Sequence, residues 1–264
     1  MLKIIIILFM WCSVSEASEY FIVTYNVWFD YSTSEERVPK LLDAIEKPDV
    51  IAFQEVKRWF VNDLKRDGRF RNYNIVMKNG WNDSIRGGLL ILTKSKILEQ
   101  AYYDLPSTMG RGMLYSVINI DGTSVCIATS HLESMPEDTN IRIKQLKIIF
   151  EKTSSCNNLI LLGDFNFGDG EPENEVIDST YLDVWKTLKA DKLGYTWDIK
   201  KNKLAEENSF PSEGSRRLDK IYVKGKHLMP VEIQIIGDIP FQSPAGKVLF
   251  PSDHFGLSAK FAIH

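Results

Sequence analysis

One stretch of the sequence decides the fold: Leu159-Ile160-Leu161-Leu162-Gly163-Asp164-Phe165-Asn166. A short apolar run of this kind is typical of a buried strand, and two polar side chains follow it directly. Asp164 and Asn166 are therefore expected at the end of a strand, where loops carry chemistry. The same arrangement of an apolar run followed by polar residues recurs along the chain.

Further apolar runs have the length and the β-branched content of strands rather than helices. They span residues 21–27, 50–53, 88–92, 114–120, 124–130, 220–223, 231–236 and 255–261. Asp121-Gly122 lies between two of them and predicts a tight hairpin, because both residues tolerate positive φ. Helical periodicity occurs between strands, at residues 34–45 and more loosely at 141–150. Crossovers together with a hairpin predict a mixed α/β architecture of sheets covered by helices.

The composition agrees with a single globular domain. The chain has 264 residues, of which 44% are hydrophobic and 25% charged, with a formal net charge of -3. These values exclude a disordered or fibrous chain, and no repeat or linker divides the sequence. The dispersed charge also argues against a broad basic surface that coats nucleic acid. A polyanionic substrate would have to be held locally.

The first residues are typical of a secretory signal. Lys3 precedes an unbroken apolar stretch from Ile4 to Val14, and Ser15-Glu16-Ala17 has the small residues of a cleavage site. A buried first strand or a membrane anchor is the alternative, but a bilayer span needs about 20 apolar residues. We therefore expect residues 1–17 to be a signal peptide, residues 18–264 to be the domain, and the protein to be periplasmic or secreted without a stable membrane span.

Two cysteines remain once this leader is removed, Cys126 and Cys156. An exported protein meets conditions that permit a disulfide. We nevertheless expect two unpaired thiols, one of them a small core residue. No C-x-x-C pair or Cys/His cluster is present, so a structural zinc site is not expected.

Polar residues end or open several of the predicted strands. They are Asn26, Glu55, His131, Asp164, Asn166, Asp219, Asp253 and His254. Each has an ordinary explanation when taken alone, such as a turn, a cap, a solvated strand end or a core histidine. Because strand ends of a layered sheet converge on one rim, the set together predicts a functional site.

The residue types suit phosphate chemistry. Glu55, with Asn26 beside it, offers hard oxygen ligands for Mg²⁺ or Mn²⁺, which bind phosphate oxygens directly. Asp164 can accept a proton from an attacking water. A bound metal would offset charge on the phosphate and the leaving oxygen.

Three further side chains can donate to the oxygens of a pentacovalent phosphate: Asn166, His131 and His254. Asp219 is placed to orient His254 through its second ring nitrogen and to hold it cationic. Asp253 precedes His254 and is included in the catalytic set.

The ordered motifs resemble the endonuclease/exonuclease/phosphatase superfamily. They are Thr24-Tyr25-Asn26, Gln54-Glu55-Val56, Ser130-His131-Leu132-Glu133-Ser134, Gly163-Asp164-Phe165-Asn166, Arg217-Leu218-Asp219-Lys220-Ile221 and Ser252-Asp253-His254-Phe255-Gly256-Leu257. The resemblance implies a deoxyribonuclease I-like, two-sheet β-sandwich flanked by helices, in four α/β/β/α layers.

Other segments are similar to the tyrosyl-DNA phosphodiesterase branch of that superfamily. They include Asp183-Val184-Trp185, Tyr195-Thr196-Trp197-Asp198 and Phe250-Pro251-Ser252-Asp253-His254. This likeness implies a Mg²⁺ cofactor bound by Glu55, hydrolysis of a 5′-phosphotyrosyl bond at a DNA end, and DNA contacts by Ser134 and Trp197. The branch has an arginine at the substrate phosphate where this chain has Gly168, and an aromatic residue where it has Leu218.

Alternatives remain for two side chains and for the function. Trp197 either stacks on a nucleobase or belongs to the core, and Arg111, between two glycines, either reaches a phosphate or is a solvated loop residue. The leading expectation is an exported, monomeric phosphodiesterase that acts on a DNA 5′ end or another phosphodiester. A secreted deoxyribonuclease I-like endonuclease, a sphingomyelinase-like enzyme and a catalytically inactive binding protein are the alternatives.

Overall fold

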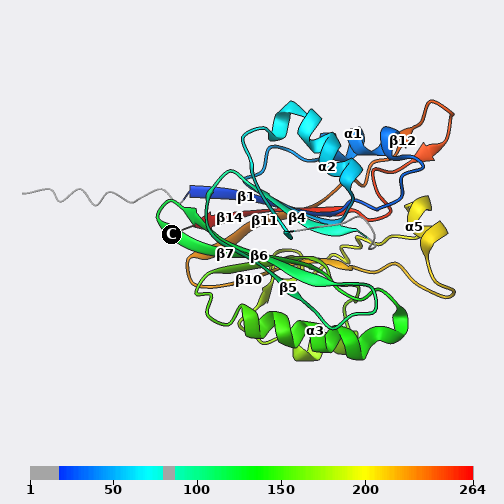
Figure 1. The fold of residues 1–264 in the computed structure, drawn as a ribbon. Helices are drawn as coiled ribbons and strands as arrows, with labels where there is room; N and C mark the ends of the chain where they lie inside the picture. The colour runs from blue at the N-terminus through cyan, green and yellow to red at the C-terminus, as the bar shows by residue number, and fades with distance from the viewer. Residues whose placement is uncertain (1–17, 80–86, 264) are drawn as a thin grey trace, which may run out of the picture.

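The computed structural model describes residues 18–79 and 87–263, so the predicted signal peptide lies outside the described residues. Two six-stranded sheets pack face to face, with helices on their outer faces (Figure 1). This confirms the predicted two-sheet sandwich flanked by helices. The strand that begins the described chain pairs with the one that ends it, Ser18 lying opposite Ile263.

The first sheet has the strand order β11-β14-β1-β2-β4-β3. Its strands are β1 (Ser18–Asn26), β2 (Val50–Val56), β3 (Asn74–Met77), β4 (Gly88–Thr93), β11 (Leu228–Ile236) and β14 (Gly256–Ile263). Strands β1 and β2 are parallel, and the other neighbours are antiparallel. Helices α1 (Ser34–Ala44) and α2 (Arg58–Arg66) cover its outer face, above a buried cluster that includes Leu41 and Phe53.

The second sheet has the order β5-β6-β7-β8-β10-β9. Its strands are β5 (Lys96–Asp104), β6 (Gly112–Ile120), β7 (Thr123–His131), β8 (Leu159–Asp164), β9 (Leu182–Asp183) and β10 (Asp219–Lys224). Strands β7 and β8 are parallel, joined by a crossover that contains α3 (Thr139–Lys152). Short elements complete the fold: α4 (Val184–Leu188), α5 (Lys203–Asn208), the hairpin β12 (Phe241–Gln242) with β13 (Val248–Leu249), and 3-10 turns at Gly68–Phe70, Pro136–Asp138 and Pro172–Val176.

Local sequence explains most of these elements. Asp121 and Gly122 have φ of 48° and 90° between β6 and β7, which confirms the predicted hairpin. Strands β3 and β5 and helix α2 are not predicted by the sequence pattern. Strand β5 lies at the edge of its sheet and is mostly exposed, so its sequence lacks the apolar pattern on which strand prediction depends.

The two cysteines form a disulfide, so the expectation of unpaired thiols is wrong. Cys126 and Cys156 are bonded, with Cα atoms 6.2 Å apart. The cause is the register of the parallel pair, which places Cys126 opposite Leu159 at the start of β8. Cys156 lies just before that strand, and the sheet brings together two residues separated by 30 positions. The pairing depends on a non-local contact that the spacing does not encode.

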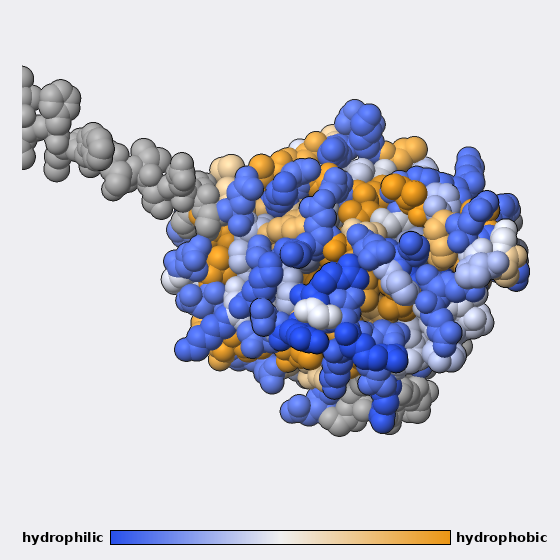
Figure 2. Space-filling view, turned by 90° about the horizontal axis from the view of Figure 1, so that it is seen from above, coloured by the Kyte–Doolittle hydropathy of each residue, from blue (hydrophilic) through white to orange (hydrophobic). Residues whose placement is uncertain are grey.

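The surface over α1 and α2 is mainly hydrophilic, with hydrophobic residues distributed between the charged ones (Figure 2). This distribution agrees with the dispersed charge of the sequence. Within residues 18–79 and 87–263, no helix has the length and apolar character needed to cross a membrane.

Candidate active site

Strand register brings the predicted site residues to one rim. In the first sheet the last residue of β1, Asn26, lies beside Gln54, directly before Glu55. In the second sheet Asp164 lies between His131 of β7 and Asp219 of β10. The carboxyl ends of the two parallel pairs therefore supply most of the site, as the sequence pattern predicts.

The backbone at Glu55 is held in an unusual conformation. Its φ is 59°, at an irregularity where the pairing of β2 with β4 shifts between Phe53 and Val56. Gly87 approaches so closely that a Cβ there would lie 2.4 Å from Glu55 Cα. The carboxylate accepts a hydrogen bond of 3.0 Å from the backbone N–H of Phe29. Conformations of this kind persist where the surrounding structure enforces them, often at functional sites.

Asp164 is the centre of the site. Asn26 Nδ2 donates to its Oδ2 at 2.9 Å, and the backbone N–H of Asn166 donates to its Oδ1 at 3.0 Å. Two imidazole nitrogens face the same Oδ2, His131 Nε2 at 3.3 Å and His254 Nε2 at 3.6 Å. The two histidines therefore converge on one carboxylate oxygen from opposite sheets.

The two histidines differ in charge because their other ring nitrogens have different partners. Burial and the Arg111 guanidinium, 2.9 Å from His131 Nδ1, hold the pKa of His131 well below its usual value. Burial opposes ionisation of His254 too, but Asp219, 2.8 Å from its Nδ1, and Asp164 raise its pKa well above the usual value. Neutral His131 thus lies opposite cationic His254, and Asp219 lies at the second ring nitrogen of His254, where the sequence predicts it.

The carboxyl groups differ in the same way. Burial opposes ionisation of Asp164, but His254 and His131 lower its pKa below the usual value. Burial, together with the charge of Asp253, raises the pKa of Glu55 to about 7. Burial also raises the pKa of Asp253. Asp164 is therefore ionised at neutral pH, while the Glu55 side of the site lacks a full countercharge.

These groups open into a hollow of about 230 Å³, which we call the catalytic cleft. Eight of the residues predicted from sequence line it: Glu55, His131, Ser134, Asp164, Asn166, Trp197, Asp253 and His254. Asn26 and Asp219 are completely buried behind this lining. The cleft is therefore built mainly from the strand-end residues.

Arg111 and Trp197 are both buried rather than exposed on the surface. Arg111 is buried, and it donates to His131 Nδ1 and to Ser134 Oγ, so it is not the solvated loop residue considered as an alternative. Trp197 is also buried, and its ring lies against that of His254 with centroids 4.9 Å apart. It forms a wall of the cleft beside the cationic histidine.

Sequence reasoning missed several residues of the cleft. They are Trp28, Phe29, Asn208, Phe210, Glu213, Arg216 and Leu218. Asn208 is representative: its Nδ2 donates to Asp253 Oδ2 at 3.1 Å from the end of α5. The local sequence of α5 has no motif that signals this contact. Arg216 could have been found, because it directly precedes the Arg217-Leu218-Asp219 motif.

One group of described residues has the composition of a metal site. Ligand atoms of Asp164, Asp219 and His254 all lie within 4.8 Å of one another. These atoms lie close together because His254 is hydrogen-bonded to Asp219 and faces Asp164, so they already have protein partners. The Glu55 carboxylate, which lines the cleft and has a raised pKa, is the better oxygen ligand for a hard cation.

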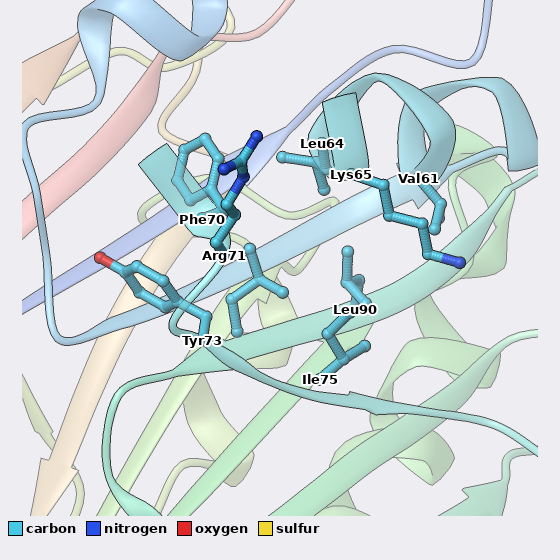
Figure 3. A pocket seen from close by; sticks show the side chains of 9 residues that line it. Val61, Leu64, Lys65, Phe70, Arg71, Tyr73, Ile75 and Leu90 are labelled. Carbon is cyan, nitrogen blue, oxygen red and sulfur yellow. The ribbon is translucent and has the colours of Figure 1, made fainter. Parts of the chain in front are cut away.

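Further hollows among the described residues have other linings. A larger one of about 530 Å³, which we call the basic cleft, is lined by Lys186, Lys189, Lys192, Arg216 and Arg217 among others. A smaller apolar pocket of about 160 Å³ lies between α2 and strands β3 and β4, where Val61, Leu64, Ile75 and Leu90 point toward one another (Figure 3). None of the residues predicted for catalysis lines this apolar pocket.

Comparison with known proteins agrees with this geometry. The endonuclease/exonuclease/phosphatase family profile matches residues 23–254. Tyrosyl-DNA phosphodiesterase 2 of Xenopus tropicalis is 32% identical over 261 residues, which cover 94% of this chain and 67% of the relative. The Homo sapiens protein of the same name is 29% identical over 255 residues, covering 91% of this chain and 67% of its own length.

Solved structures support the same assignment. The structure of the Danio rerio enzyme complexed with single-strand DNA product superposes with a TM-score of 0.80 and 27% identity, covering 92% of this chain and 99% of that one. A family protein from Bacteroides thetaiotaomicron shares the fold, with a TM-score of 0.74 at 15% identity, covering 94% of this chain and 99% of that one. The sequence match, the fold and the rim of polar strand ends agree, and the chain belongs to the endonuclease/exonuclease/phosphatase family.

Proposed function

We propose that this chain is a divalent-metal-dependent phosphodiesterase that hydrolyses the 5′-phosphotyrosyl bond at a DNA end by direct attack of water. The observation that carries the proposal is the pair of histidines, one neutral and one cationic, which both face the ionised Asp164 in the catalytic cleft. This arrangement can position a water and stabilise charge on a phosphate at the same time.

Each side chain has a definite part in this reaction. Asp164 orients the attacking water and accepts its proton, and Asn26 holds the Asp164 carboxylate through the 2.9 Å hydrogen bond. His254, held cationic by Asp219, donates its Nε2–H to a phosphate oxygen as negative charge develops there. His131 contributes a neutral donor, because Arg111 occupies its Nδ1 and leaves the proton on Nε2.

The residues present fit a divalent cation at Glu55. Its carboxylate is buried, and its pKa of about 7 reflects burial and the nearby Asp253 charge, which a bound cation would offset. Asn26 Oδ1 accepts one hydrogen bond, of 3.0 Å from the Trp28 N–H, so a second lone pair remains for a ligand. When bound, Mg²⁺ or Mn²⁺ would stabilise charge on the phosphate and on the leaving oxygen.

Similarity to tyrosyl-DNA phosphodiesterase 2 supports the choice of substrate. The Danio rerio structure was solved with a single-strand DNA product, and a cleft of about 230 Å³ has room for one phosphate and its neighbouring groups. The dispersed charge of this chain agrees with recognition of a chain end rather than a long duplex.

We also propose that the protein is exported. The apolar leader of residues 1–17 motivates this proposal, and the Cys126–Cys156 disulfide supports it, because such bonds persist mainly in oxidising compartments. Mass spectrometry of the protein recovered from culture medium or periplasm should give an N-terminus after Ala17. Full-length protein confined to the cytoplasm would contradict export.

A substrate panel tests the catalytic proposal. The wild-type protein is incubated in Mg²⁺ with a 5′-phosphotyrosyl oligonucleotide, supercoiled plasmid DNA and sphingomyelin vesicles, with D164N as the inactive control. Release of tyrosine from the oligonucleotide supports the proposal. Plasmid nicking alone would favour an endonuclease, sphingomyelin cleavage alone a lipid phosphodiesterase, and no reaction a binding protein.

A further inference from the structure

Arg216 lies where the two clefts meet. It lines both the catalytic cleft and the basic cleft, and its side chain is 23% exposed. Among the described residues that line the catalytic cleft, it is the one arginine or lysine. A phosphodiester in that cleft would therefore find one permanently charged cation on the wall, in addition to His254.

Gly168 makes room for this arginine. A Cβ placed on Gly168 would lie 3.3 Å from Arg216 Cδ, 3.4 Å from Arg216 Cγ and 2.9 Å from Glu171 Oε1. The aliphatic part of Arg216 therefore occupies the space in which a side chain at position 168 would start. Position 168 is two residues after Asn166, so the arginine lies over the loop that follows the catalytic Asp164.

Two carboxylates hold the guanidinium in this position. Arg216 Nη1 donates to Glu171 Oε1 at 3.1 Å, and Nη2 donates to Glu213. The buried Nε has no hydrogen-bond partner within residues 18–79 and 87–263. Because a guanidinium carries five N–H groups, these contacts orient Arg216 and leave donors for a further acceptor. Glu213 also lines the catalytic cleft, so it competes with an incoming anion for the same group.

We propose that Arg216, which precedes β10 in the chain, binds a non-bridging phosphate oxygen of the substrate. Its guanidinium supplies the cation that Gly168 cannot provide. This assignment rests on the proposed phosphodiesterase function. The strand beyond that phosphate then enters the basic cleft, where Lys186, Lys189 and Lys192 line the wall. Glu213 keeps Arg216 oriented in the free enzyme and is displaced as the phosphate binds.

The test compares five proteins on a single-stranded 5′-phosphotyrosyl oligonucleotide in Mg²⁺: wild type, R216Q, R216K, E213Q and the double variant G168R/R216A. R216Q should raise KM at least tenfold, lower kcat/KM about 100-fold and reduce the salt dependence of log(kcat/KM) by about one phosphate contact. R216K should keep part of the binding, because it retains the charge and loses the fork of donors.

The other two variants separate binding from structure. E213Q should lower KM, because the competing charge is removed, and G168R/R216A should recover part of the activity that R216Q loses. Wild-type KM and salt dependence in R216Q would overturn the proposal. Equal losses of activity and melting temperature in R216Q and E213Q would also overturn it, since the ion pair would then be structural. A wild-type protein that cleaves no phosphodiester would overturn both this proposal and the proposed function.

Discussion

Two groups of charged side chains meet at the start of strand β10 and differ in how closely their members pair. The catalytic cluster consists of Asp164, His131, His254 and Asp219. The ion-pair cluster consists of Arg217, Asp169, Asp183 and Lys220. Asp219 and Lys220 are adjacent in the chain, and alternate residues of a strand face opposite sides of a sheet, so one strand serves both clusters.

Their contacts show the difference. Arg217 makes four hydrogen bonds to the two carboxylates of Asp169 and Asp183, at 2.6 to 3.1 Å, and Lys220 donates to Arg217 O at 2.9 Å. In the catalytic cluster Asp219 lies 2.8 Å from His254 Nδ1, whereas the two histidine Nε2 atoms lie 3.3 and 3.6 Å from Asp164. Close pairing in the first case stabilises the fold. Looser contacts in the second leave donors for a substrate.

Removal of the proposed metal should have the largest effect and should act on one cluster alone. Excess EDTA should abolish phosphodiester hydrolysis, because burial and the Asp253 charge disfavour the ionised Glu55 carboxylate unless a cation is bound. Added Mg²⁺ or Mn²⁺ should restore it, and E55Q should respond to neither addition. Circular dichroism should be unchanged throughout. Full activity in EDTA would contradict a metal-dependent reaction.

Substitution of His254 should come next in size. H254A removes the cationic donor and should lower kcat on the order of 10³-fold in steady-state assays. Its melting temperature should fall less than that of an Arg217 variant, because the ion-pair cluster is untouched and the buried Asp219, whose pKa burial already raises, can take up a proton when its partner at 2.8 Å is lost. A kcat within tenfold of the wild type would mean that His254 supports the fold rather than the reaction.

Substitution of Arg217 should give the reverse result. R217M keeps the apolar stem and removes the guanidinium from two carboxylates. Asp169 is 40% exposed and keeps Lys186 at 3.0 Å, whereas Asp183 is 11% exposed. Because water can reach Asp169, we expect a loss of about 3 kcal/mol of unfolding free energy, at the low end for broken buried pairs. Urea denaturation measures this loss. An unchanged midpoint would remove the distinction between the clusters.

The titration of Lys220 should have the smallest effect. Burial, together with the Arg217 charge, lowers the pKa of Lys220 to about 7. Between pH 7 and 10 the unfolded chain therefore binds more protons at this residue than the folded chain does. Stability should rise with pH in that window, by up to about 1.4 kcal/mol per pH unit. Urea titrations at pH 7 and 9 should show a smaller rise of unfolding free energy in K220M than in the wild type. An equal rise in the two proteins would contradict the lowered pKa of Lys220.

The comparison also separates what sequence could predict from what it could not. Asp164 and His131 are recognisable because each follows an apolar strand, and a strand end has few alternative positions in a layered fold. The role of Arg217 is not recognisable in this way, since Asp169 and Asp183 reach it from loops and a short strand far away in the chain. Arg216 depends on space left by Gly168, which only the assembled loops reveal.

The disulfide also joins residues that are far apart in the sequence, and this has a practical consequence. Cys126 and Cys156 close a covalent ring that contains His131 at the end of β7, the following loop with Ser134, and α3. A protease that cuts once inside this ring leaves two polypeptides joined through sulfur. Such nicked protein should migrate as one band on a non-reducing gel and as two fragments after reduction. The disulfide therefore keeps this part of the catalytic cleft attached after a single chain break. Without the disulfide, the same break would separate the two fragments.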